Sequence, residues 1–141
     1  MLISVIACGL AALATPASAT FSIAACDAEK TCGVAVATNN LAVGASVAYA
    51  QGGVGAVATQ FETNPNYGSK GLRLLSLGRS PEEVVRTLLA EDGDFEGQDT
   101  SWRQVALVAA DGRSYAFTGA QAAASTWAGD EAQKGFSVQG N

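Results

Sequence analysis

The chain has 141 residues, of which 48% are hydrophobic and 15% are charged, and its 13 acidic and 8 basic residues give a net charge of -5. This length is typical of one domain, and the apolar content excludes intrinsic disorder, which requires few apolar residues and many like charges. The acidic balance argues against nucleic acid and anionic membrane surfaces as partners. Histidine is absent, which excludes Ser-His-Asp triads, Cys-His dyads and most zinc, copper and iron sites.

Residues 1–19 have the pattern of a secretory signal peptide. The segment contains no charged residue, and an apolar core leads to Pro16 and to Ala17-Ser18-Ala19, which is typical of cleavage after Ala19. It is shorter than the roughly 20 apolar residues that span a bilayer. No Lys or Arg precedes the core, which is atypical of a signal peptide, so a retained segment is one alternative. The residues before Cys8 also fit a lipoprotein-type site, so lipidation of Cys8 is another. We expect a mature domain over 20–141, periplasmic or secreted.

Two cysteines remain after such cleavage. Cys26 and Cys32 bracket a polar turn between two apolar segments, and an even pair in an oxidising compartment favours a disulfide. We therefore predict a Cys26–Cys32 disulfide across the mouth of a hairpin. Two unpaired, half-buried thiols are the alternative. Two ligands are too few for a metal site, so no metal is predicted.

Alternating residues predict four strands in the first half of the mature chain, over 20–26, 32–38, 43–49 and 54–60. Nearly every second position within 33–59 is Gly, Ala, Ser or Thr. Such small residues indicate strands that are buried on both faces or that hold a ligand close to the backbone.

Two helices are predicted in the middle of the chain. The first covers residues 71–77 and ends at Gly78, a common stop residue. The second begins with a capping box at Ser80-Pro81-Glu82-Glu83, continues with an apolar stripe and ends near Ala90. Residues 91–100 are acidic and contain glycine, so we expect them to form a mobile, solvated surface loop. Asp92-Gly93-Asp94 lacks the rest of a calcium-binding pattern.

A hairpin is predicted after this loop. Residues 105–110 and 114–118 flank Asp111-Gly112, the strongest short hairpin signal. Residues 120–135 are expected to form a loop anchored by Trp127.

A last strand is predicted to begin at Phe136. It would end abruptly at Gly140-Asn141 and leave an unpaired edge, which folded proteins usually cover. On this pattern we expect the sequence to be incomplete at its C-terminus.

Cleavage after Ala19 would make Thr20 the N-terminal residue. An N-terminal threonine carries a nucleophilic hydroxyl and its own base, because an α-amino group with a pKa of roughly 7.7–8.0 is partly deprotonated at neutral pH. The amine can accept the hydroxyl proton directly or through one water. Thr20 is therefore a candidate nucleophile. The alternative is that Thr20 simply starts an edge strand.

From Thr20 onward the chain resembles the domain-of-unknown-function family ten-twenty-eight, of the N-terminal nucleophile (Ntn) hydrolase-like superfamily. The resembling blocks follow in order along the chain: T-F-S-I-A-A-C-D (20–27), G-V-A-V-A-T (33–38), L-A-V-G-A-S-V-A-Y-A (41–50), G-G-V-G-A-V-A-T-Q (52–60), N-P-N-Y-G-S-K-G-L-R-L-L (64–75), R-Q-V-A-L-V-A-A-D-G-R-S-Y-A-F-T-G (103–119), T-W-A-G (126–129) and G-F-S-V-Q-G-N (135–141). The resemblance implies an α+β fold, a four-layer α/β/β/α sandwich with two antiparallel sheets face to face and helices outside. Relatives continue past Asn141 with further strand and helix.

The resemblance also implies where a site would form. In cytosolic relatives the threonine follows the initiator methionine, so signal cleavage here would deliver the same terminus at Thr20. Asn39 stands where relatives commonly place a larger basic or aromatic residue, and Asp130 where they often carry a histidine. Five residues are candidates to line the pocket or stabilise an oxyanion: Asn39, Thr59, Gln60, Asn64 and Tyr67. For each of them, the alternative is a role in a turn or in packing.

The sequence is compatible with two functions. The first is an exported amidohydrolase that uses Thr20 to cleave an amide bond in a small-molecule or peptide-like substrate and needs no cofactor. The second is a non-catalytic periplasmic binding or assembly protein on the same fold. We expect no nucleic-acid partner and no membrane partner after signal cleavage, and a homo-oligomer stays open.

Overall fold

The computed structural model describes residues 19–125 and 128–141. The helices in this part are α1 (Asn66–Ser76), α2 (Pro81–Ala90) and α3 (Ala120–Ser125), and 3-10 turns lie at Val43–Ala45, Phe95–Gly97 and Thr100–Trp102. The strands are β1 (Thr20–Cys26), β2 (Cys32–Thr38), β3 (Ala48–Gln51), β4 (Gly55–Phe61), β5 (Arg103–Ala109), β6 (Ser114–Thr118), β7 (Gly129–Gln133) and β8 (Phe136–Gly140).

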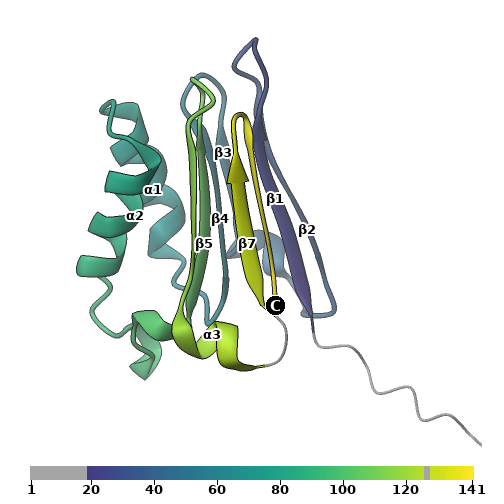
Figure 1. Ribbon diagram of the computed structural model, residues 1–141, viewed down its shortest axis with the longest axis vertical. Coiled ribbons are helices and arrows are strands. Elements are labelled where there is room, and N and C mark those ends of the chain that lie inside the picture. Colours follow the sequence, from purple (N-terminus) through teal and green to yellow (C-terminus); the bar gives the residue numbers. More distant parts are fainter. Residues whose placement is uncertain (1–18, 126–127) are drawn as a thin grey trace, which may run out of the picture.

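The strands form two four-stranded antiparallel sheets, which face each other (Figure 1). One sheet has the order β2-β1-β8-β7, and the other has the order β3-β4-β5-β6. We call them the N-terminal-strand sheet and the helix-covered sheet. Of the strands rich in small residues, β4 is buried on both faces as predicted, whereas β2 and β3 are partly exposed. A Cβ atom on Gly55 would lie 2.4 Å from the carbonyl oxygen of Val108 on β5, so this close approach requires glycine.

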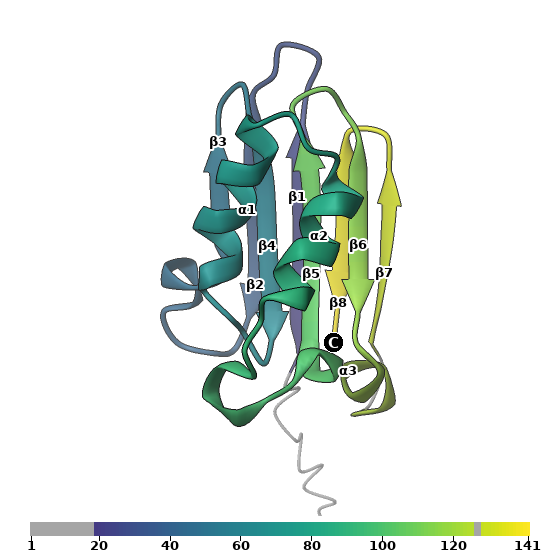
Figure 2. The ribbon, with the colours of Figure 1, turned by 90° about the vertical axis from the view of Figure 1, so that its left-hand side faces the viewer.

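Helices α1 and α2 lie together on the outer face of the helix-covered sheet (Figure 2). Their leucine and valine side chains pack with Val57 of β4 and Leu107 of β5 in the main apolar core. Fully burying one such side chain stabilises the fold by roughly 1.5–3 kcal/mol. The predicted capping box is confirmed, since the Ser80 side chain accepts from the Glu83 N–H and the Glu83 carboxylate accepts from the Ser80 N–H.

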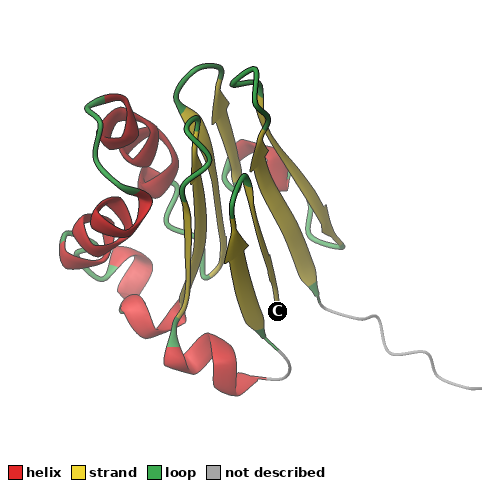
Figure 3. Cartoon of the chain, turned by 45° about the horizontal axis from the view of Figure 1, so that its top comes forward, coloured by secondary structure: helices red, strands yellow, loops and turns green. Residues whose placement is uncertain are grey.

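The predicted four-layer α/β/β/α sandwich is wrong. The described residues form a small α+β fold in which α1 and α2 cover one sheet, and within 19–125 and 128–141 no helix covers the outer face of the N-terminal-strand sheet (Figure 3). The short connection between α1 and α2 keeps both helices on the same sheet. The third helix, α3, has six residues and packs beside the 3-10 turn at Thr100–Trp102.

Several local predictions also need correction. Residues 43–49 form a 3-10 turn before the short strand β3, and the predicted loop over 120–135 contains α3 and β7. The last strand, β8, is not an unpaired edge, because it lies between β1 and β7. The predicted leader over 1–19, apart from Ala19, and the Trp127 anchor lie outside the described residues.

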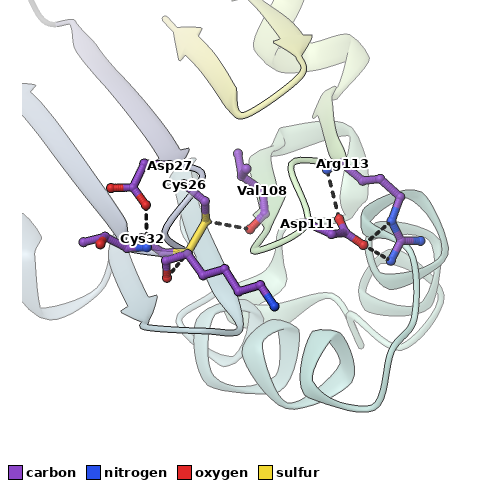
Figure 4. The surroundings of a disulfide bond; sticks show 8 residues. Cys26, Asp27, Cys32, Val108, Asp111 and Arg113 are labelled. Carbon is purple, nitrogen blue, oxygen red and sulfur yellow. Dashed lines mark hydrogen bonds and ion pairs between the residues drawn. A yellow bond between two sulfur atoms is a disulfide. The ribbon is translucent and has the colours of Figure 1, made fainter.

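The predicted disulfide is confirmed. Cys26 and Cys32 face each other in register at the mouth of the β1–β2 hairpin, with Cα atoms 4.1 Å apart. Figure 4 shows Cys26 turned toward β5, where its sulfur lies 3.8 Å from the carbonyl oxygen of Val108. The disulfide therefore closes the end of β1 that is opposite Thr20.

Candidate functional site around Thr20

Thr20 begins β1, and its side chain points between the two sheets. Strand alternation places Thr20, Ser22 and Ala24 on this inner face, and Thr20 is only 6% exposed. Thr38 of β2 lies directly opposite in the register, and the two threonine hydroxyl oxygens are 3.0 Å apart. The Asn40 N–H also donates to the Thr38 hydroxyl oxygen, over 3.1 Å. The candidate nucleophile is thus held by the side chain of the neighbouring strand.

The nitrogen of Thr20 lies at the end of the sheet beside the last described residue. The Thr20 N–H donates to the Asn141 carbonyl oxygen over 3.2 Å, and the Asn141 N–H donates back to the Thr20 carbonyl oxygen over 3.1 Å. In the unprocessed chain this nitrogen belongs to the peptide bond with Ala19, which is half-buried. Only cleavage after Ala19 would turn it into an amine that can act as a base.

A chain of buried carboxamides extends from Thr20 into the inter-sheet space. Gln60 of β4 accepts a hydrogen bond from the Ser22 hydroxyl over 2.7 Å and donates to the Thr20 carbonyl oxygen over 3.1 Å. Its nitrogen also donates to the Gln104 oxygen over 2.8 Å. Of the predicted site residues, Gln60 is therefore the one that the fold brings against Thr20.

Gln104 extends this chain of carboxamides to the end of β8. Its oxygen also accepts from the Asn141 side chain over 3.0 Å, and its nitrogen lies 2.9 Å from the carbonyl oxygen of Gly140. Sequence reasoning missed Gln104, Thr38 and Asn141. A glutamine in an otherwise apolar strand was the available signal, because a buried carboxamide must find partners.

The remaining predicted site residues do not contact Thr20. Asn39 is exposed in the bend after β2. Thr59 precedes Gln60 on β4, so it points to the helix side of the sheet, where its buried hydroxyl has no hydrogen-bond partner among the described residues. Asn64 and Tyr67 also lie on the helix side, and they line a separate hollow of about 390 Å³.

Asn64 and Tyr67 belong to a buried cluster around Asp92. The Asp92 carboxylate accepts from the Tyr67 hydroxyl over 2.6 Å, from the Asn64 amide over 3.0 Å and from the Arg103 guanidinium over 3.0 Å. Arg103 is 1% exposed and also donates to the backbone carbonyls of Glu62, Phe95 and Gln98. The cluster therefore ties residues 91–100, which we expected to be a mobile loop, to α1 and β5.

The electrostatics of this cluster indicate a structural role. Burial would raise the pKa of Asp92, but hydrogen bonds from Arg103, Tyr67 and Asn64 outweigh it and hold that pKa at about 2. Burial, followed by the hydrogen bond to Asp92, raises the pKa of Tyr67. Both side chains therefore keep fixed protonation states at neutral pH. Side chains whose hydrogen-bonding atoms all have partners, and whose charge does not change near neutral pH, hold a loop in place and do not transfer protons.

Within 19–125 and 128–141, no three His, Cys, Asp or Glu side chains are grouped to hold a metal ion. In the same residues no helix is both long and apolar enough to cross a membrane. A groove of about 640 Å³ lies on the outer face of β1, where Phe21 and Ile23 point, away from the Thr20 hydroxyl.

Comparison with known proteins places the chain in a family. A search of curated proteins finds no match. A solved structure, "Crystal structure of protein SPO2555 from Silicibacter pomeroyi", is similar, with a TM-score of 0.74 and 30% identity over 88% of this chain. The match covers 53% of that protein, so the chain spans about half of its length. The family described as "Family of unknown function (DUF1028)" matches residues 20–141, and the chain therefore belongs to the DUF1028 family.

Proposed function

We propose that the chain is an exported amidohydrolase of the N-terminal nucleophile superfamily, and that removal of residues 1–19 activates it by exposing Thr20. The observation that carries the proposal is the environment of Thr20: a buried hydroxyl bonded to Thr38, with Gln60 fixing the adjacent carbonyl. Two further findings support it. The family match begins at Thr20, and the Cys26–Cys32 disulfide suits an oxidising compartment.

The proposed reaction requires only the two functional groups of Thr20. The amine accepts the hydroxyl proton while Oγ1 attacks the carbonyl carbon of the amide, which gives a tetrahedral oxyanion. As this intermediate collapses, the carbon–nitrogen bond breaks, the leaving nitrogen takes the proton from the Thr20 amine, and the acyl group stays on Oγ1 as an ester. A water molecule, deprotonated by the same amine, then attacks the ester carbon. The bond between this carbon and Oγ1 breaks, Oγ1 takes the proton back from the amine, and the acid is released.

The neighbouring side chains would position the nucleophile. Thr38 holds the hydroxyl through the 3.0 Å contact, so the Thr20 side chain is restricted to one orientation. Gln60 holds the Thr20 carbonyl, and the carbonyl of Asn141 faces the nitrogen that would become the amine. Such preorganisation lowers the barrier because the groups do not reorient during the reaction.

The experiment that tests the proposal begins with the terminus. Intact-mass measurement of the exported protein is expected to give a chain that starts at Thr20. Treatment with a β-lactone, which acylates N-terminal threonine hydroxyls, is expected to add one label, and peptide mapping should locate it on Thr20. Thr20→Ser should keep the label, because serine retains a hydroxyl next to the amine, and Thr20→Ala should lose it.

Thr31→Ala is the matched control, because Thr31 is exposed in the β1–β2 turn and should not affect labelling. Thermal melting of each variant separates loss of reactivity from loss of fold. A chain that keeps residues 1–19 after export, or a Thr20→Ala variant that labels as well as the wild type, would overturn the amidohydrolase proposal.

A non-catalytic binding protein is the second candidate, and one observation favours it. The groove of about 640 Å³ lies on the outer face of the N-terminal-strand sheet, and Ile23 and Val138 are exposed there. An exposed apolar surface of this kind is typical of an interaction site. On this alternative, Thr20 serves only to start β1, and the β-lactone leaves no label.

A further inference from the structure

A stacked aromatic pair lies on the helix-covered sheet, at the same end of the molecule as Thr20. Phe61 ends β4, and Trp102 ends the 3-10 turn that leads into β5. Their rings are nearly parallel, with an interplanar angle of 11° and centroids 5.9 Å apart, which is the offset arrangement that aromatic pairs favour. Both residues are half-buried, so part of the pair stays accessible.

The pair adjoins the side chains that hold Thr20. Phe61 directly follows Gln60, whose carboxamide nitrogen donates to the Thr20 carbonyl oxygen over 3.1 Å. Trp102 lies two positions before Gln104, which accepts from the Gln60 carboxamide over 2.8 Å. In Figure 2, β1 begins, β4 ends and β5 begins at the same end of the molecule. The aromatic pair is therefore the apolar surface next to the carboxamides that position the candidate nucleophile.

The backbone of Phe61 is strained. Its φ of 67° lies in the left-handed region, which a large aromatic residue rarely adopts. Hydrogen bonds on the next residue hold this conformation: the Glu62 N–H donates to the Trp102 carbonyl over 3.2 Å, and Arg103 donates to the Glu62 carbonyl over 2.7 Å. Such strain persists only where the surroundings impose it, and it clusters at sites that bind ligands.

The turn that carries Trp102 is fixed as well. The Asp99 carboxylate accepts from the Ser101 N–H over 2.8 Å, and the turn packs against α3 so closely that the Ser101 carbonyl leaves no room for a Cβ atom on Gly119. Both rings are therefore held in place before any ligand arrives. A preorganised surface of this kind binds with a smaller loss of conformational freedom.

The side chains around Thr20 carry no charge that could select a charged substrate. Thr38 and Gln60 contact Thr20, and residues 31–61, which contain both, include no Asp, Glu, Lys or Arg. The guanidinium of Arg103 is buried and already paired with a carboxylate. A charged group would lose its hydration here without gaining a partner of opposite charge. An apolar group would instead gain contact with the aromatic rings.

We propose that Phe61 and Trp102 receive the acyl group of the substrate, and that this group is uncharged and apolar, with an aromatic ring favoured. The inference rests on the proposed function, because it assigns a substrate class to the same Thr20 site. Phe61 and Trp102 determine specificity, and Thr20 carries out the reaction.

The test compares three β-lactones that share one ring and differ only in its substituent, which is methyl, benzyl or 4-carboxybenzyl. The exported protein that starts at Thr20 is labelled at increasing lactone concentrations, which separates affinity from maximal labelling rate. High salt screens the net charge of -5. We expect the benzyl lactone to bind about tenfold more tightly than either of the others, because only it offers the rings an uncharged aromatic group.

Trp102→Leu and Phe61→Leu should each reduce this preference severalfold, and the loss should appear in the affinity rather than in the maximal rate. Phe61→Gly provides a second variant at the strained position, because glycine adopts the positive φ without strain and removes the ring. Tyr115→Leu is the matched control, since Tyr115 is a half-buried aromatic residue that packs on the helix side of β6, and it should leave the preference intact. Thermal melting checks that each variant is folded.

The outcomes separate the two proposals. Equal binding of the three lactones with the label on Thr20, or a benzyl preference that survives both Trp102→Leu and Phe61→Gly, would overturn the substrate class and leave the amidohydrolase proposal standing. If none of the three lactones labels Thr20, both proposals are wrong.

Discussion

Gln60 and Gln104 lie directly opposite each other on β4 and β5, and the carboxamide nitrogen of Gln60 donates to the carboxamide oxygen of Gln104 over 2.8 Å. Both side chains are buried, at 1% and 0% exposure. Burying a carboxamide costs free energy unless hydrogen bonds replace those to water. Here the replacements come from the other sheet, at Ser22, Thr20 and Gly140. The geometry around Thr20 thus depends on polar contacts between the sheets.

Gln60→Ala should destabilise the fold by about 2–3 kcal/mol. The substitution leaves the Ser22 hydroxyl without its acceptor and removes one of the two donors to the Thr20 carbonyl, and a buried unsatisfied group costs about 1–3 kcal/mol. Urea denaturation measures the loss of unfolding free energy. Gln51→Ala is the matched control, since Gln51 is exposed at the end of β3, and should change stability by less than about 0.5 kcal/mol. Equal stabilities of the two variants would contradict the structural role of Gln60.

Asp92 should make the fold less stable in acid. Its pKa is about 2 in the folded chain, below the ordinary value of 3.8. A carboxyl with a lowered folded pKa contributes stability above its unfolded pKa, and this contribution is lost as the pH falls from about 4 to about 2. The difference corresponds to about 2 kcal/mol. Urea denaturation at a series of pH values should show this loss.

Asp92→Asn should remove that part of the acid dependence. It should also destabilise the fold by about 3 kcal/mol at neutral pH, because Arg103 would remain buried without its carboxylate partner. Asp94→Asn, at an exposed position two residues further on, is the control and should keep the wild-type acid dependence. If both variants lose stability in acid as the wild type does, Asp92 is not the titrating group.

The elements predicted well from the sequence are those with local signals. Alternation gave the bounds of β1 and β2, Asp111-Gly112 gave the β5–β6 hairpin, and the Ser80 capping box gave the start of α2. Each of these depends on residues that are neighbours in the chain. The Cys26–Cys32 disulfide belongs to the same class, because its partners are only six positions apart in the chain.

The predictions that failed concern features that depend on contacts between residues far apart in the chain. The residue pattern predicts two helices in this region, but not which sheet each helix packs on. The four-layer arrangement was implied by the resemblance to the family, and the described residues contain no helix layer on the outer face of the N-terminal-strand sheet. Residues 129–133 read as loop, because glycine and polar residues lack strand alternation. They become β7 only through pairing with β8 and contact with β6.

The site shows the same division. Thr20 was a candidate because signal cleavage would expose it, and Gln60 because it ends a strand. Thr38 could not be selected, since its contact with Thr20 joins residues 18 positions apart. Gln104 carried a signal as a glutamine in an apolar strand, but that signal does not identify Gln60, 44 positions away, as its partner. Asn64 and Tyr67 were placed near the site because of their position in the chain, but the fold directs both to Asp92 on the other side of β4.

Ser80→Ala should destabilise α2 by about 1 kcal/mol. The Ser80 hydroxyl accepts from the Glu83 N–H, and replacing such an N-cap by alanine leaves this N–H without its partner. Thermal or urea unfolding measures the effect. Ser69→Ala, at an exposed position within α1, controls for the loss of a hydroxyl and should be neutral or slightly stabilising, because alanine favours helix. A smaller loss at Ser80 than at Ser69 would show that the capping box does not stabilise α2.

Reduction of the disulfide should destabilise the fold by about 2 kcal/mol, because the Cys26–Cys32 bond removes loop-closure entropy from the unfolded chain. The double variant Cys26→Ala/Cys32→Ala should show the same loss in urea denaturation. Dithiothreitol should lower the stability of the wild type to that of the double variant and leave the variant unchanged, so the reagent is controlled within the experiment. Because the disulfide closes the end of β1 that is opposite Thr20, labelling of the exported protein by the β-lactone should persist after reduction. Loss of labelling while the fold remains intact would show that the hairpin mouth and the Thr20 site are coupled along β1.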